Sequence, residues 1–287
     1  MTLELVRVVG FASLQGAPLV GLRKYGVPSG GAFDLVSLRL ANALAGNGED
    51  ARCIELVNAA GDFKSHGDIA MAVVGPIEQV SIDGVPAPAN ASFLLRAGQT
   101  LSIPASRSGL TVYLSCAGGF HGFGPHETTE RLQSGEKLKT TQVEHPPRPM
   151  RLSQHYFVLR AIRVVLTTQI AQSILTVSAN SSRVGIRLQG LTGGTSERRR
   201  SEPVCVGLIQ RVPSGELIII GPDGPTIGGY EPIGWVIDAD LPLLGQLRPG
   251  ATLRLDSVTQ DGARKLNLDA EIQLQKRVKE ITLASSL

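Results

Sequence analysis

The feature that most constrains the fold is the frequency of glycine and proline. The chain has 287 residues, of which 33 are glycine and 17 are proline, so about one residue in six favours a turn. Short β-prone runs lie between these residues, for example at 5–9, 70–74 and 111–115. Such runs, bounded by turn formers, are typical of strands. We therefore expect a mainly β protein with a few short helices.

One segment has a clear helical pattern. Apolar residues recur every three or four positions between Asp34 and Gly46. Asp34 can accept the free N–H groups at the helix start, and Gly46 can adopt the left-handed turn at its end. Residues 238–250 contain two prolines and leave room for one helical turn, and 270–283 could be a strand or a helix.

Two further local features bear on the organisation of the chain. Residues 80–83, followed by Gly84 and then residues 94–96, predict a hairpin. At roughly 150 residues per domain, the length suggests two domains. The proline-rich stretch 144–150 is the best candidate linker, which predicts domains at 1–145 and 146–287.

Composition excludes several function classes. The net charge of +3 is spread along the chain, and the one basic run, 198–200, is most simply a solvated loop, so we expect no nucleic-acid partner. The first ten residues do not resemble a signal peptide, and no apolar run approaches 18 residues, so we expect no membrane partner. Three widely spaced cysteines argue against a disulfide framework and favour the cytoplasm.

Two arginines stand out as candidate ligand-binding residues. Arg183 and Arg187 flank a glycine four positions apart, and two positions of equal parity lie on one face of a strand. Guanidinium groups hold carboxylates or phosphates bidentately, so the pair could bind an acidic substrate. The alternative is a surface ladder paired with Glu or Asp.

Two glycine-rich loops are the other candidates. Residues 223–230 combine Asp223, Thr226, Gly228, Gly229 and Tyr230, and a loop of this kind suits a ligand approached by backbone. A tight connection between strands is the competing interpretation. Residues 26–34 form a second such loop that runs into a helix start, which suits an anion, although an ordinary cap at Asp34 explains it equally well.

Several common active sites are missing from the sequence. It contains no P-loop, no GxSxG elbow and no HExxH pattern. His121, His126, Glu127 and Glu130 crowd one segment, but their spacing matches no standard metal site, so we expect no metal.

Blocks of sequence in both halves resemble one known family. They are YGVPSGGAFD at 25–34, LRLAN at 38–42, RVGIRL at 183–188, GLIQ at 207–210, DGPTIGGY at 223–230 and ADLP at 239–242. In this order they resemble the biotin-dependent carboxyltransferase family, also called allophanate hydrolase subunit 2 or KipA-like. Bacterial members of the family include the C subunit of 5-oxoprolinase.

The resemblance implies two cyclophilin-like β-barrel domains and a role as one subunit of a complex. Its partners would be a KipI-like protein, the B subunit, and a LamB/YcsF-like protein, the A subunit. The implied reaction is the ATP-dependent hydrolysis of 5-oxo-L-proline to L-glutamate, with ATP bound by the complex. Two alternatives remain, a biotin-dependent carboxyltransferase of urea or amide metabolism, the only case that would use biotin, and a non-catalytic regulator that binds a KipI-like kinase inhibitor.

The resemblance also suggests roles for the candidate residues. Asp223 and Tyr230 would move protons or orient water, and Arg187 would act with them as a catalytic residue. Arg183 and Arg187 would hold the substrate carboxylate or a phosphate, and the Gly228 and Gly229 N–H groups would stabilise oxyanion charge. The remaining expected substrate-binding residues are Gln210, Thr226 and Asp34.

Overall fold

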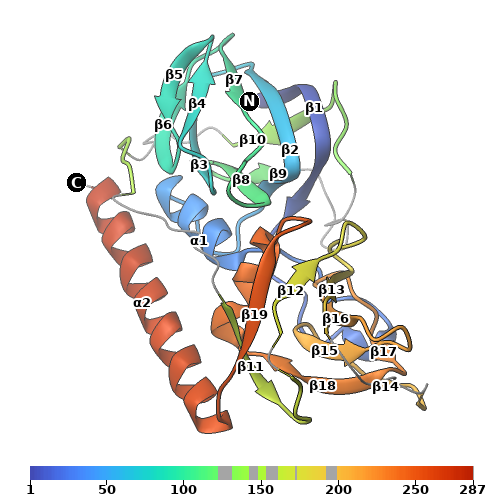
Figure 1. Ribbon diagram of the computed structural model, residues 1–287. Coiled ribbons are helices and arrows are strands. Elements are labelled where there is room, and N and C mark those ends of the chain that lie inside the picture. Colours follow the sequence, from blue (N-terminus) through green and yellow to red (C-terminus); the bar gives the residue numbers. More distant parts are fainter. Residues whose placement is uncertain (122–130, 142–147, 153–160, 172, 192–198, 287) are drawn as a thin grey trace. The chain divides into compact units, whose positions relative to one another are not determined.

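The computed structural model describes residues 1–121, 131–141, 148–152, 161–171, 173–191 and 199–286 (Figure 1). The chain divides into two compact units. The first comprises Met1–Ala17, Leu35–Phe157 and Leu274–Leu287, and the second comprises Pro18–Asp34 and Val158–Gln273. Whereas the domain prediction is a single cut at residue 145, both units are discontinuous in sequence. Residues 18–34 belong to the second unit, although they lie more than 120 residues before the rest of it.

The first unit is built on one branched sheet of ten strands. The long strands β1 and β2 pair antiparallel along most of their length, and β2 also pairs with β7 and β8. The strands are β1 (Thr2–Gln15), β2 (Cys53–Ser65), β3 (Ile69–Val74), β4 (Gln79–Ile82), β5 (Val85–Pro88), β6 (Ala91–Leu95), β7 (Thr100–Ile103), β8 (Thr111–Cys116), β9 (Phe120–His121) and β10 (Lys137–Thr140).

The two faces of β2 and β8 differ in polarity. Ile54 and Leu56 point into the hydrophobic core of this unit, as do Val112 and Leu114 on the paired strand. Because side chains alternate across a strand, the residues between them face the other way. These residues are polar or carry a polar group, and they are also buried: Cys53, Glu55, Thr111, Tyr113 and Ser115.

The predicted helix is confirmed as α1 (Leu35–Leu44). It begins directly after Asp34, and Gly46 has a φ of 73°, as its predicted left-handed turn requires. The helix contacts β3 and β8, and eight of its ten residues are buried.

The second unit contains a closed barrel of seven strands in the order β11-β18-β15-β16-β13-β12-β19. Its core contains side chains from these strands, Leu244 and Leu247 from the region of residues 238–247, and Phe33, which the segment 18–34 supplies. The strands are β11 (Ala161–Leu166), β12 (Leu175–Val177), β13 (Gly185–Gln189), β15 (Leu208–Arg211), β16 (Leu217–Ile220), β18 (Glu231–Val236) and β19 (Thr252–Ser257). A separate ribbon pairs β14 (Glu202–Pro203) with β17 (Ile227–Gly228), and the unit also holds the 3₁₀ helices η1 (Arg23–Tyr25) and η2 (Asp238–Gln246).

The mainly β class is confirmed, with three local differences from the sequence prediction. The segment left open near the C-terminus is a helix, and at 27 residues α2 (Gln260–Ser286) is longer than the short helices expected. The prolines near residue 240 do not limit the chain to a single turn, because η2 continues through Pro242. The predicted hairpin turns at Asp83-Gly84, but the partner is wrong. Strand β4 pairs with β5, whereas residues 91–95 pair with β3.

Candidate functional site

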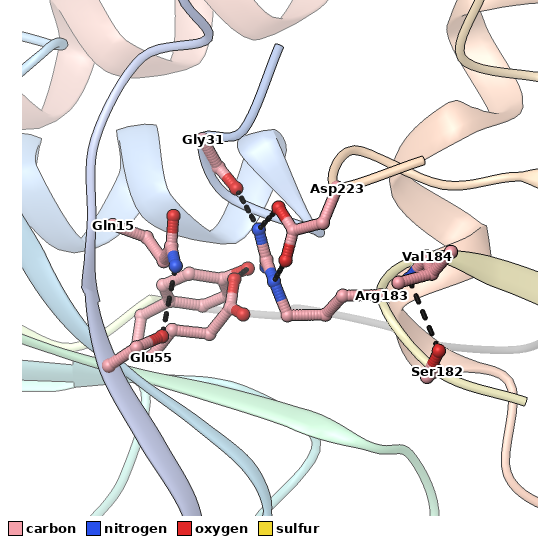
Figure 2. Close-up of polar contacts among 9 residues, drawn as sticks. Gln15, Gly31, Glu55, Ser182, Arg183, Val184 and Asp223 are labelled. Atoms are coloured by element: carbon pink, nitrogen blue, oxygen red, sulfur yellow. Dashed lines mark hydrogen bonds and ion pairs between the residues drawn. The ribbon is translucent and has the colours of Figure 1, made fainter. Parts of the chain in front are cut away.

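A bidentate ion pair between Arg183 and Asp223 lies at the centre of the candidate site in the second unit (Figure 2). Arg183 Nε donates to Asp223 Oδ2 at 2.7 Å, and Nη2 donates to Oδ1 at 2.9 Å. Only 7% of the arginine side chain and 19% of the aspartate side chain are exposed. Parallel N–H···O bonds of this kind fix the plane of a carboxylate as well as its position. Asp223 is therefore held in one orientation on its loop.

The crossover segment 18–34 reaches this same ion pair. Arg183 Nη2 also donates to the carbonyl of Gly31 at 2.7 Å, as Figure 2 shows, and the guanidinium lies 5.7 Å from the centre of the Phe33 ring. The N–H of Gly30 donates to the carbonyl of Pro222 at 2.9 Å, beside Asp223. Gly30 and Gly31 have φ values of 56° and 80°, which side-chain-bearing residues rarely adopt. The two loops singled out in the sequence are thus brought together.

Asp34 closes the crossover segment against η2. Its Oδ2 accepts a hydrogen bond from Gln246 Nε2 at 2.8 Å, and both side chains are buried. A Cβ atom on Gly245 would lie 2.8 Å from the backbone of Phe33, so a glycine is needed where η2 meets the segment. The carboxylate of Asp34 is therefore engaged within the second unit as well as lying at the start of α1.

The predicted arginine pair is not brought together. Arg183 precedes β13, whereas Arg187 lies within the strand, between inward-pointing Ile186 and Leu188. Arg187 therefore faces the outside of the barrel, where its Nη1 lies 3.7 Å from Glu216 Oε2, and 41% of its side chain is exposed. The surroundings of Arg187 thus match the alternative interpretation, in which the arginine lies on the surface beside an acidic partner.

The loop 223–230 packs closely against its own chain. Gly228 pairs with Glu202 in the β14–β17 ribbon, and a Cβ on Gly229 would lie 2.8 Å from the Arg199 carbonyl. Gln210 Nε2 donates to the carbonyl of Tyr230 at 3.3 Å. The carbonyl of Thr226 accepts from the N–H of Val204. The glycines therefore allow a close approach of the protein's own backbone, as the strand-connection interpretation expects.

A second buried carboxylate, Asp240, fixes the start of η2. Arg163 donates to it from both its backbone N–H, at 2.7 Å, and its guanidinium. The hydrogen bonds to Asp240 raise the pKa of Arg163. This pair orients η2, which carries the partner of Asp34.

Sequence reasoning missed a buried polar pair in the first unit. Tyr113 Oη donates to Glu55 Oε2 at 2.6 Å, and neither side chain is exposed. Nearby on β1, Gln15 Nε2 donates to Ser13 Oγ at 2.9 Å. A fully buried carboxylate is costly unless it is hydrogen-bonded, so the pair is a specific feature of this sheet face. The available signal was a carboxylate, Glu55, between the apolar residues Ile54 and Leu56.

A network around Asn42 continues the same polar face toward α1. Its Oδ1 accepts from Ser115 Oγ at 2.8 Å and from Cys53 Sγ at 3.2 Å. Its Nδ2 donates to the carbonyls of Glu49 and Ala51. Burial raises the pKa of Cys53 to about 12, so this thiol stays protonated and unreactive at neutral pH.

No group of three or more potential metal ligands occurs among the residues that the structure describes. Most of the segment with His126, Glu127 and Glu130 lies outside the described residues, as do parts of the predicted linker and basic run. Within the described ranges, no helix is both long enough and apolar enough to cross a lipid bilayer.

Comparison with known proteins places the chain in a family. The model for the carboxyltransferase domain, subdomains A and B, matches residues 25–257. The chain belongs to this carboxyltransferase domain family. The match includes both glycine-rich loops, the Arg183–Asp223 pair and η2.

Two curated relatives match this member over nearly their whole length. The 5-oxoprolinase C subunit of Haemophilus influenzae is 30% identical to this chain, over 96% of this chain and 97% of that protein. The Escherichia coli protein of the same name is 24% identical, over 94% and 95%. Urea amidolyase of Saccharomyces cerevisiae is also 24% identical, but the chain spans 17% of its length.

Solved structures have the same fold. The crystal structure of TTHA0988 has a TM-score of 0.82 at 26% identity, over 89% of this chain and 56% of that one. The urea amidolyase of K. lactis has a TM-score of 0.81 at 22% identity, and the chain spans 20% of it. This family member thus corresponds to about half of the first protein and to one part of the second.

Proposed function

We propose that this protein is the C subunit of an ATP-dependent 5-oxoprolinase complex, which hydrolyses 5-oxo-L-proline to L-glutamate. The observation that carries the proposal is the extent of the match. The chain spans 97% of a relative named as the C subunit of 5-oxoprolinase, at 30% identity, but only 17% of the yeast urea amidolyase. The higher identity to that relative and its nearly complete coverage support this assignment over the urea amidolyases.

The geometry supports Asp223 as the residue that orients water or accepts a proton. Opening the lactam adds one water molecule across its C–N bond, and a carboxylate fixed at the reacting centre can orient that water. Arg183 uses its Nε and Nη2 atoms on Asp223 and Gly31, so we assign it a positioning role in place of binding the substrate carboxylate. Tyr230, on the same loop, remains the proposed partner for proton transfer.

Three of the other predicted residues, Gln210, Thr226 and Gly228, contact or form the loop 223–230 that carries Asp223. Gln210 holds the Tyr230 carbonyl, and Thr226 and Gly228 belong to the segment that joins the ribbon to Asp223. Arg187, which lies on the outside of the barrel beside Glu216, has no place in this proposal.

The ATP of the proposed reaction does not fit the candidate site of this chain. Arg183 is engaged by Asp223 and by a backbone carbonyl, and the Gly228-Gly229 pair packs against the protein's own backbone, so the described residues of this site form no cradle for a phosphate. We therefore assign ATP to one of the partners. The proposed partners are a KipI-like protein and a LamB/YcsF-like protein, in a cytoplasmic complex. The three free thiols support that compartment.

A second candidate function is carboxyl transfer in urea metabolism. The family description and the matches to urea amidolyase and to a putative urea carboxylase favour it. It would require a carboxybiotin donor, and this sequence itself contains no Ala-Met-Lys-Met attachment motif.

A substrate comparison separates the two functions. The protein is co-purified with its two partner subunits and supplied with ATP and either 5-oxoproline or urea with bicarbonate. Glutamate release from 5-oxoproline, with no ATP hydrolysis stimulated by urea, supports the proposal. ATP hydrolysis stimulated by urea and not by 5-oxoproline would overturn it.

A further inference from the structure

Four large apolar side chains are exposed around the candidate site of the second unit. The exposed fractions are 91% for Val20, 72% for Tyr25, 53% for Val184 and 61% for Ile227. Single exposed apolar residues are common on protein surfaces, but a group of them on neighbouring loops marks an interaction site. We call these four residues the loop surface.

Hydrogen bonds hold the loops of this surface together. Arg23, in η1 between Val20 and Tyr25, donates from Nη2 to the carbonyls of Val204 and Pro225 at 2.8 and 2.7 Å. Pro225 lies two residues before Ile227, the first residue of β17. In Figure 1 the blue segment that contains η1 accordingly lies beside β16 and β17, within the second unit.

The loop surface adjoins the Arg183–Asp223 pair. Val184 follows Arg183, and its carbonyl accepts from the N–H of Gly221 at 3.0 Å, next to the loop that carries Asp223. A molecule bound to the loop surface would therefore lie against the backbone that holds the proposed catalytic carboxylate.

Exposed cations border the loop surface. Lys24 Nζ lies 5.0 Å from the centre of the Tyr25 ring, and the backbone N–H of Arg199 donates to the Gly229 carbonyl, two residues beyond Ile227. Arg200 follows and is also exposed. Glu202 is the one exposed carboxylate on the β14–β17 ribbon, so this border is basic overall.

We propose that the loop surface docks another protein of the enzyme complex through an apolar patch bordered by acidic side chains. The inference rests on the proposed function, since the relatives are named as subunits and the chain spans nearly their whole length. Charge selects a different protein over a second copy of this chain. A two-fold interface places the same patch on both sides, which would bring the basic borders together.

The test measures binding of the full chain to purified partner subunits. Ile227→Asp removes an apolar contact and places a negative charge opposite the acidic partner, which it repels. Arg200→Glu reverses the sign of one charge at the border of the loop surface. Each should weaken the Kd at least tenfold, and wild-type binding should weaken as NaCl rises from about 50 to 500 mM. Native mass spectrometry of the same samples records whether the chain pairs with itself.

Matched controls come from the same unit. Ile174 is 68% exposed but lies against Gly190, at the opposite end of β13 from Val184, and Lys265 is exposed on α2. Ile174→Asp and Lys265→Glu should leave the Kd unchanged. Trp235 fluorescence in urea verifies that every variant remains folded.

The outcomes separate this inference from the proposed function. Ile227→Asp and Arg200→Glu proteins that bind the partners as tightly as wild type overturn the docking surface. So does a result in which these variants lose self-association of the chain but still bind the partners, because the surface would then join two copies of this chain. A complex that forms through the loop surface but releases no glutamate upholds the docking surface and refutes the reaction.

Discussion

The buried Arg183–Asp223 pair gives the sharpest stability prediction. Replacing Asp223 with Ala leaves a guanidinium that is 7% exposed without its carboxylate partner. Removing one partner of a buried ion pair typically costs about 3–5 kcal/mol. Because Asp223 itself is 19% exposed, we take the lower end, about 3 kcal/mol, which corresponds to a fall in Tm of about 6–12 °C.

The measurement uses the only tryptophan of the sequence, Trp235, which lies on β18 of the second unit. Urea unfolding followed by its fluorescence reports the free energy of unfolding of the barrel that contains the pair. A cycle with Arg183→Met, Asp223→Ala and the double variant should give a coupling energy of about 2 kcal/mol or more.

A second ion pair on the same barrel is the control. Arg187 and Glu216 lie 3.7 Å apart, and 41% and 25% of their side chains are exposed. The corresponding cycle should give a coupling energy below about 1 kcal/mol. If Asp223→Ala costs no more free energy of unfolding than Glu216→Ala, the positioning role of Arg183 is refuted.

Three further predictions follow from other contacts. Phe33→Ala should destabilise the barrel by about 3–5 kcal/mol in the Trp235 assay, because this side chain enters its core from the crossover segment; an unchanged urea midpoint would contradict that placement. In the native protein a thiol reagent should label one cysteine, the exposed Cys205, and all three after denaturation, and fast labelling of a second native thiol would be inconsistent with the burial. A hydrogen bond from the His66 ring lowers the pKa of Glu4 below its ordinary value of 4.5. The Glu4–His66 contact therefore stabilises the fold fully above pH 4.5, and this stabilisation is lost as the pH falls through the lowered pKa. Glu4→Gln should flatten the pH dependence of the free energy of unfolding in that acidic range.

Local signals predicted the elements that depend on local residues. The helix at 35–44 follows from its apolar spacing, Asp34 and Gly46, and the many turns follow from glycine and proline. The hairpin partner was wrong because Val85–Pro88 contains two prolines, a composition that does not predict a strand. The structure places this strand at the edge of the sheet, where a missing N–H donor is tolerated.

The candidate site was predictable in parts but not in its assembly. The sequence marked the 26–34 and 223–230 loops by residue type, and only the fold shows that Arg183 joins them through Gly31 and Asp223. The four-residue spacing of Arg183 and Arg187 did not indicate that β13 begins between them, at Gly185. Buried polar pairs such as Glu55 and Tyr113 depend on strand pairing across 58 residues, which spacing does not reveal.

An omission experiment tests the central claim most directly. The two partner subunits are purified without this chain, supplied with 5-oxoproline and ATP, and assayed for glutamate before and after the purified chain is added. The account predicts no glutamate from the partner subunits alone, none from this chain alone, and ATP-dependent release when all three are combined. Glutamate release at the same rate with and without this chain would contradict the account.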